Sequence, residues 1–298
     1  MRSCVIFNPI AGRRRSRRRL ARFRERWNAR AEFWPTEYRG HATELARMAC
    51  EQGFTTVVAA GGDGTAHEVA NGILSAAVDQ VTLAVVPIGS ANDYAYSLAR
   101  QFGVSRLDDE SHAKVDIGFA TTPGGFETYF VESLGLGLSA QVTLESQRIS
   151  RLQGKALYAL AAYRAVRSYR SSELTVQYDD EPPWTARTLM LSAMIGNREG
   201  SFLLAPHAEL DDGQFDVVSA GVMGRWRVLG MLPRLALFGL PARHPQIALR
   251  RCRTLQVHSA APLAAHTDGE MFCTPAEGIQ DLTIRLLPAR LRVKVCRP

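Results

Sequence analysis

The chain has 298 residues, of which 46% are hydrophobic and 22% are charged. This composition is typical of a soluble globular protein, and the length suits roughly two domains of about 150 residues each. No apolar run reaches the roughly 18 residues that a membrane-spanning helix needs, and the first residues lack the plan of a signal peptide, so we expect a cytoplasmic protein. The five cysteines lack C-x-x-C spacing, which predicts reduced thiols rather than a zinc site or a disulfide framework.

The net charge of +7 belongs to one segment. Residues 13–30 hold ten arginines and one glutamate, a local balance of +9 that leaves −2 for the rest of the chain. In a helix, cations near the N-terminal end oppose the macrodipole, so we expect an anion to compensate them. The phosphates of a nucleotide, an anionic membrane surface and nucleic acid are candidates, and a solvated basic helix face is the alternative.

The first half of the chain alternates strands with helices. The hydrophobic pattern predicts strands at Val5–Phe7, Glu32–Pro35, Val57–Ala60 and Leu83–Val86, separated by helices that include the arginine-rich segment and His41–Gln52, with a last helix ending near Phe102. This alternation predicts a doubly wound parallel sheet, which binds ligands beyond the carboxyl ends of its strands. Three unusual loops, at residues 8–12, 61–64 and 87–93, follow strands at that edge.

The loop Gly61-Gly62-Asp63-Gly64 joins a strand to a helix. An ordinary turn needs one glycine, whereas three around an aspartate suggest that backbone approaches something closely, and a helix start with bare amides suits an anion. We therefore favour a phosphate site. Thr65 and Glu68 also fit an S/T-x-x-E capping box, which is a purely structural interpretation.

After about Asp116 the hydrophobic period changes towards two, so the second half is predicted to be mainly β. Helical insertions are expected near Gly154–Ser168 and Arg225–Phe238. Both are apolar enough for core packing, which we favour, or for contact with a membrane interface. The break at residues 119–125 predicts domains at 1–120 and 121–298, with the last residues able to pack back on the first domain.

Six motifs in order resemble the diacylglycerol kinase catalytic family, which includes bacterial lipid kinases and the sphingosine and ceramide kinases. They are NPIAG at 8–12, GGDGTAHEVANG at 61–72, PIGSANDYA at 87–95, VDIG at 115–118, PHAELDDGQFDV at 206–217 and TDGE at 267–270. The resemblance spans nearly the whole chain. It implies a Rossmann-like first domain of the NAD kinase and phosphofructokinase type, followed by a C-terminal β-sandwich.

The same resemblance implies an ATP site. The family's loops bind ATP, which assigns cofactor binding here to Asn8, Pro9, Ile10, Ala11, Gly12, Thr36, Gly61, Gly62, Asp63, Gly64, Thr65, Ala66, His67, Ser90 and Asn92. Ser90 replaces the family's usual threonine but keeps a hydroxyl. For Asn92 and Asp93, capping of the following helix is the competing interpretation.

Magnesium is implied as well. By resemblance, Asp93 and Asp116 belong to a network of aspartates, water and Mg²⁺ that braces the site. Glu209, Asp212 and Gln214 match the ligands of a structural Mg²⁺, and oxygen ligands suit this hard cation. From the residues alone, Asp212-Gly213 is a hairpin turn.

Phosphorylating an alcohol needs a group that accepts the hydroxyl proton. The resemblance assigns this role to Glu270 with Asp268 as its partner; a plain turn is the alternative, and we expect His266 to be an ordinary surface residue. The expected protein is an ATP- and Mg²⁺-dependent kinase that converts diacylglycerol to phosphatidic acid. It would bind the membrane surface peripherally during turnover, without nucleic acid, and a homodimer is left open.

Two rival hypotheses differ in class. An NAD or sugar kinase would share the GGDGT loop but not the PIGSAND and TDGE motifs. A non-catalytic protein that senses nucleotides or binds nucleic acid would use the arginine run as its functional surface.

Overall fold

The structure is a computed structural model that describes residues 2–9, 14–27, 30–76, 78, 80–104, 111–149, 152, 154–169, 171–241 and 243–296. The chain forms two compact units, residues 1–117 with 289–298, and residues 118–288. The first division lies near the predicted boundary at residue 120, and the C-terminal residues belong to the first unit. The predicted nucleotide contacts at Ile10, Ala11 and Gly12 lie outside the described residues.

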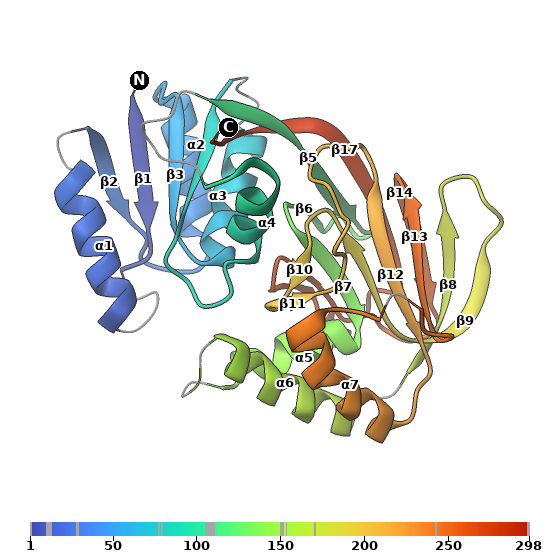
Figure 1. The fold of residues 1–298 in the computed structure, drawn as a ribbon. Coiled ribbons are helices and arrows are strands. Elements are labelled where there is room, and N and C mark those ends of the chain that lie inside the picture. The colour runs from blue at the N-terminus through green and yellow to red at the C-terminus, as the bar shows by residue number, and fades with distance from the viewer. Residues whose placement is uncertain are drawn as a thin grey trace. The chain divides into compact units, whose positions relative to one another are not determined.

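The first unit is built on a parallel sheet (Figure 1). Its strands are β1 (Ser3–Phe7), β2 (Ala31–Pro35), β3 (Thr56–Gly61) and β4 (Thr82–Pro87), in the order β2-β1-β3-β4. The end of β17 (Asp281–Lys294) adds in parallel to β4, with Arg292 opposite Thr82. Helices α1 (Arg14–Trp27), α2 (His41–Glu51), α3 (Asp63–Ser75) and α4 (Asp93–Phe102) follow β1 to β4 in turn. The predicted α/β unit is confirmed.

Burial explains why these segments form this sheet. Every residue of β3 is buried, as expected for a parallel strand covered on both faces. Val5, Val58 and Ala84 form part of a core that Leu20 of α1 joins. Helices α2 and α3 approach closely at Gly72, where a Cβ atom would lie 2.3 Å from the carbonyl oxygen of Thr43.

The second unit is mainly antiparallel β, as predicted. The chain passes from the first unit to the second within β5 (His112–Thr121), of which residues 118–121 belong to the second unit. The further strands of the second unit are β6 (Glu127–Phe130), β7 (Ser133–Gly137), β8 (Ser172–Tyr178), β9 (Trp184–Met194), β10 (Arg198–Glu199), β11 (Phe202–Leu203), β12 (Phe215–Gly221), β13 (Ile247–Cys252), β14 (Thr254–Ser259), β15 (Ala265–Thr267), β16 (Glu270–Cys273) and most of β17. Neighbours follow the order β16-β15-β7-β9-β8-β14-β17, and β12 pairs with β9 and β13. A short 3-10 helix covers Pro275–Glu277.

Helices α5 (Leu138–Gln147), α6 (Gly154–Ser168) and α7 (Arg225–Phe238) gather in the second unit (Figure 1). Leu138, Val166 and Val228, one from each helix, share a buried cluster. The sequence pattern predicted α6 and α7 but missed α5. Helix α5 begins directly after Gly137, whose φ of 73° turns the chain. Because no loop lies between β7 and α5, the sequence pattern contains no signal for the start of a helix there.

All five cysteines are free, as predicted, and four of them are buried. Among the described residues, no helix is long and apolar enough to cross a membrane.

Candidate functional site

The predicted ligand loops of the first unit leave the sheet at one edge. Phe7 pairs with both Pro35 and Ala60, and Gly61 pairs with Pro87, so the segments after β1 to β4 begin side by side. Thr36 donates its backbone N–H to Phe7 O at 2.9 Å, which places this predicted contact beside Asn8 and Pro9. The structure thus brings the described loop residues of the predicted ATP site to one edge, while their contact with ATP stays a prediction.

Asp63 joins two of these loops. One carboxylate oxygen accepts the backbone N–H of Asn92 at 2.7 Å and the other accepts that of Tyr94 at 3.3 Å. Asn92 itself has a left-handed φ of 52° and donates its side-chain amide to Gly89 O at 2.9 Å. The start of α4 is therefore held by Asp63 from the neighbouring loop, and Asn92, at the N-cap position of α4, makes no side-chain capping hydrogen bond.

The glycines of the GGDGT loop have a packing explanation. A Cβ atom on Gly89 would lie 2.3 Å from the Cα of Gly62, so the two loops touch backbone to backbone. A Cβ on Gly61 would lie 2.2 Å from Thr65 Oγ1. The close approach inferred from these glycines is thus made at least partly by the protein itself. The feature that favours a phosphate is then the start of helix α3.

Helix α3 begins at Asp63 and has no side-chain N-cap. The predicted capping box is wrong, because the helix starts two residues before Thr65 and Glu68 acts elsewhere. The Glu68 carboxylate accepts the N–H groups of Gly40 and Ala42, at 3.0 and 3.1 Å, where α2 begins. Gly62, the N-cap residue of α3, makes no side-chain capping hydrogen bond, and the helix begins at the sheet edge where the predicted ligand loops lie, an arrangement that fits a phosphate group. Ala66 and His67 lie buried in the first turns of α3, and Ser90 lies in the loop that Gly89 brings against Gly62.

The predicted metal ligands occupy separate places. Asp93 and Asp116 are buried in the first unit, and Asp116 accepts the N–H of Ala289 at 2.7 Å. In the second unit Asp212 accepts the N–H of Gln214 at 3.0 Å and forms an ion pair with Arg251, while Glu209 is exposed. Within the described ranges, no group of three or more acidic, histidine or cysteine side chains could hold a metal. Both Mg²⁺ sites therefore stay predictions that depend on backbone oxygens and water as further ligands.

The TDGE motif is a two-residue hairpin between β15 and β16. Thr267 pairs with Glu270, and the loop residues Asp268 and Gly269 have φ values of 51° and 83°, the left-handed pair typical of a type I′ turn. Glu270 is half-buried at the first position of β16.

Asp268 fixes this hairpin from within. Its carboxylate accepts the backbone N–H groups of Val131, Glu132 and Ser133 at 3.0, 2.8 and 3.0 Å, and its own N–H donates to Ser133 O at 2.8 Å. Both carboxylate oxygens are engaged with backbone. The geometry gives Asp268 a positioning role, and Glu270 is the more accessible of the two predicted catalytic carboxylates.

His266 is not the surface residue that the sequence suggested, because it is only 1% exposed. Its Nε2 lies 2.7 Å from Ser139 Oγ, and Ser139 is also hydrogen-bonded to Glu199. Burial by itself raises the pKa of Glu199, but the neighbouring His266 and the hydrogen bonds from His266 and Ser139 outweigh burial and lower this pKa below its usual value. Sequence reasoning missed Ser139 and Glu199, since nothing local marks residues that meet only through sheet pairing.

The chain thus combines an α/β unit, whose predicted ligand loops leave one sheet edge, with an antiparallel unit that carries a carboxylate hairpin. Residues 2–122 match the model of the diacylglycerol kinase catalytic domain, and residues 132–295 match that of the YegS C-terminal NAD kinase beta sandwich-like domain. The chain belongs to the diacylglycerol kinase catalytic-domain family and is a lipid kinase.

Curated relatives agree with this assignment. The chain is 27% identical over 308 residues to a diacylglycerol kinase of Staphylococcus haemolyticus, covering 100% of this chain and 89% of that protein. It is 27% identical over 277 residues to one from Staphylococcus aureus, covering 90% and 86%. A crystal structure of a diacylglycerol kinase from Bacillus anthracis has a TM-score of 0.70 at 17% identity, covering 99% of this chain and 96% of that one. At this identity the structural likeness shows the fold alone.

Proposed function

We propose that this protein transfers the γ-phosphoryl group of ATP to the hydroxyl of diacylglycerol, forming phosphatidic acid and ADP, with Mg²⁺ as the metal cofactor. The observation that carries the proposal is the uncapped start of α3 beside the loop pair that Asp63 joins to Asn92. Relatives named diacylglycerol kinases, of which the match covers 89% and 88%, support the choice of substrate.

In the proposed reaction the first unit binds the nucleotide. The backbone amides at the start of α3 donate to phosphate oxygens, and the helix macrodipole favours their negative charge. Asp63 lies in the first turn of α3, yet its carboxylate is directed to the amides of Asn92 and Tyr94. Bound Mg²⁺ would supply positive charge that offsets the charge developing on the transferring phosphoryl group.

The second unit provides the proton acceptor. We assign this role to Glu270, whose carboxylate takes the proton of the lipid hydroxyl as that oxygen bonds to the γ-phosphorus and the bond to the leaving ADP oxygen breaks. Asp268 fixes the turn from which Glu270 projects, because its carboxylate is held by three backbone amides. Positioning and charge stabilisation are the main contributions that phosphoryl transfer needs from a protein.

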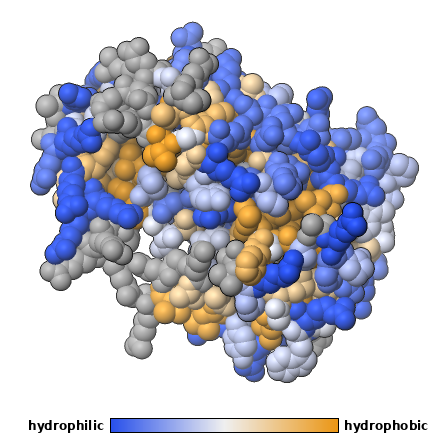
Figure 2. Space-filling view, viewed as in Figure 1, coloured by the Kyte–Doolittle hydropathy of each residue, from blue (hydrophilic) through white to orange (hydrophobic). Residues whose placement is uncertain are grey.

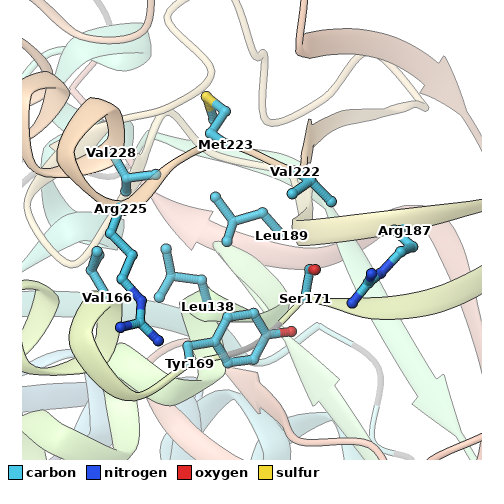
Figure 3. A pocket seen from close by; sticks show the side chains of 10 residues that line it. All are labelled: Leu138, Val166, Tyr169, Ser171, Arg187, Leu189, Val222, Met223, Arg225 and Val228. Carbon is cyan, nitrogen blue, oxygen red and sulfur yellow. The ribbon is translucent and has the colours of Figure 1, made fainter.

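A membrane lipid as substrate has support from the helices of the second unit. A pocket of about 230 Å³ is lined by apolar side chains that include Leu138, Leu189 and Val228, with Arg187 and Arg225 on opposite sides of it in the view of Figure 3. Trp226, next to Arg225, is 87% exposed. Figure 2 shows hydrophobic residues at the molecular surface among strongly hydrophilic ones. Arginines beside exposed apolar groups suit a peripheral contact with a membrane.

The decisive experiment is phosphoryl transfer from labelled ATP to a panel of diacylglycerol, other lipid alcohols, NAD and sugars, with the product identified by mass spectrometry. Wild-type protein should label diacylglycerol in the presence of Mg²⁺. Glu270→Gln should lower kcat by about 10²- to 10⁴-fold, the usual contribution of general base catalysis, while the Kd of a non-hydrolysable ATP analogue stays within about twofold. Glu173→Gln, at an exposed strand position, is the matched control. Labelling of NAD alone, or full activity of Glu270→Gln, would contradict the proposal.

A further inference from the structure

Three polar side chains behind the β15–β16 hairpin form a continuous hydrogen-bonded chain inside the second unit. Ser139 Oγ contacts both His266 Nε2 and Glu199 Oε1, and the last two atoms are 3.7 Å apart. The exposed fractions are 6% for Ser139, 1% for His266 and 12% for the Glu199 side chain. Burying such groups costs free energy unless each has a partner, and an apolar core would avoid that cost.

The far side of the imidazole sets the direction of these hydrogen bonds. His266 Nδ1 lies 3.3 Å from the backbone nitrogen of Gly269. A backbone N–H can only donate, so Nδ1 accepts and the imidazole proton is assigned to Nε2. Nε2–H then donates to Ser139 Oγ, and the Ser139 hydroxyl donates to Glu199.

This direction excludes a nucleophilic serine. Activating a serine requires an unprotonated imidazole nitrogen facing the hydroxyl, whereas Nε2 here carries the proton. Ser139 is also too deeply buried to meet a substrate. The chain of hydrogen bonds therefore ends at the backbone of the Glu270 hairpin and acts on that hairpin.

Two features of the strands leave room for this arrangement. Gly135 of β7 pairs with His266, and a Cβ atom on Gly135 would lie 2.4 Å from both His266 Nε2 and Ser139 Oγ. The β15–β16 register also shifts between Ala265 and His266, an irregularity that re-aims side chains. Glycine at position 135 is thus required by the hydrogen-bonded chain.

We propose that His266 is a positioning residue for Glu270, and that Ser139 and Glu199 act through it by fixing the orientation and tautomer of its imidazole. The Gly269 N–H lies in the turn between Asp268 and Glu270, where His266 Nδ1 accepts it. Asp268 holds one side of the turn and His266 holds the other, so the start of β16 is fixed. The inference rests on the proposed role of Glu270.

Two substitutions separate this role from a merely structural one. In His266→Asn, the terminal atoms of the amide are as many bonds from Cα as Nδ1 is, so the amide oxygen can replace Nδ1 as the acceptor. The shorter side chain does not reach Ser139, so that contact is lost. His266→Gln reaches the position of Nε2 and loses the acceptor for Gly269. We expect His266→Gln to lower kcat about tenfold and His266→Asn less than about threefold, with KM for ATP unchanged in both, as one lost hydrogen bond in the turn would produce. If His266 served only as a hydrogen-bond partner for Ser139 and Glu199, His266→Asn would lower kcat more than His266→Gln.

Hydrogen exchange of the Gly269 amide, followed by NMR, provides a readout that does not depend on activity. Exchange should be faster in His266→Gln than in His266→Asn or wild type. The same two substitutions at His258, an exposed histidine paired with Asp281, should leave kcat unchanged. Ser139→Ala changes less volume and should also lower kcat, which keeps the test informative if a His266 variant fails to fold.

Equal kcat in the two His266 variants, or equal Gly269 exchange in both, would overturn the inference. Failure of the proposed function looks different. If Glu270→Gln stayed fully active, the assignment of Glu270 would fall while Gly269 exchange still reported the hydrogen-bonded chain.

Discussion

The carboxylate of Asp63 accepts the backbone N–H of Asn92 at 2.7 Å and thereby joins the loops that follow β3 and β4. An aspartate that the GGDGT pattern suggested as a ligand-contacting residue is thus part of the scaffold of the site. Its negative charge at the start of α3 also suits the macrodipole.

Asp63→Asn is expected to weaken ATP binding. The variant replaces one carboxylate oxygen with an NH₂ group that cannot accept a backbone N–H, so the loop after β4 loses its tether. We expect about a tenfold increase in the Kd of a non-hydrolysable ATP analogue, measured by calorimetry. Asp281→Asn, which removes an exposed carboxylate paired with His258, is the control. An unchanged Kd in Asp63→Asn would show that the tether does not shape the site.

Gly89→Ala should separate the same two loops by steric means. The new methyl group would lie 2.3 Å from the Cα of Gly62, and a backbone neighbour cannot move away cheaply. We expect a loss of about 1 to 3 kcal/mol in the free energy of unfolding, together with weaker ATP binding. Gly230→Ala is the matched control, because nothing lies within 4 Å of its Cβ position in α7, and it should stabilise the protein by about 0.5 to 1 kcal/mol. Urea denaturation measures both changes, and equal effects of the two variants would refute the loop contact.

Glu68→Ala should uncap a helix other than its own. Glu68 lies in α3 but accepts the amides of Gly40 and Ala42 at the start of α2. Loss of such a cap costs about 0.5 to 2 kcal/mol, and hydrogen exchange should accelerate at those two amides. Glu51→Ala breaks only an exposed pair with Arg47 and should cost less than about 0.5 kcal/mol. Faster exchange at the start of α3 instead of α2 would restore the capping-box interpretation.

The hydrogen-bonded chain at Glu199 predicts a pH dependence of stability. The folded-state pKa of Glu199 is lowered from the ordinary value of 4.5, so its ionised form contributes stability above that value, and this contribution is lost as the pH falls through the folded-state pKa. The difference in unfolding free energy between wild type and Glu199→Gln should therefore be constant near neutral pH and shrink below pH 4.5. Urea titrations from neutral to acidic pH measure it. A difference that grows on acidification would mean that Glu199 is protonated in the folded protein.

Much of the architecture was readable from the pattern of residues. The period of the hydrophobic residues and the positions of glycines predicted the strands and helices of the first unit, the β-rich second half, and helices α6 and α7. These elements were predictable because each is specified by residues near one another in the chain. The ordered motifs likewise identified a lipid kinase, whereas the binding of its ligand at one edge of the parallel sheet stays a prediction. Helix α5 was missed because it begins at Leu138, directly after Gly137, the last residue of β7.

The partners of the polar side chains were decided only by tertiary structure. Glu68 matches a local capping box, yet its partner Gly40 lies 28 residues away, and His266 meets Ser139 across 127 residues. Local pattern carries no information about such pairs, since strand register and helix packing bring them together. The residue types of the candidate site were thus set by the sequence itself, whereas the fold determined that the Asp268 carboxylate accepts three backbone N–H groups and that Glu270 lies half-buried at the start of β16.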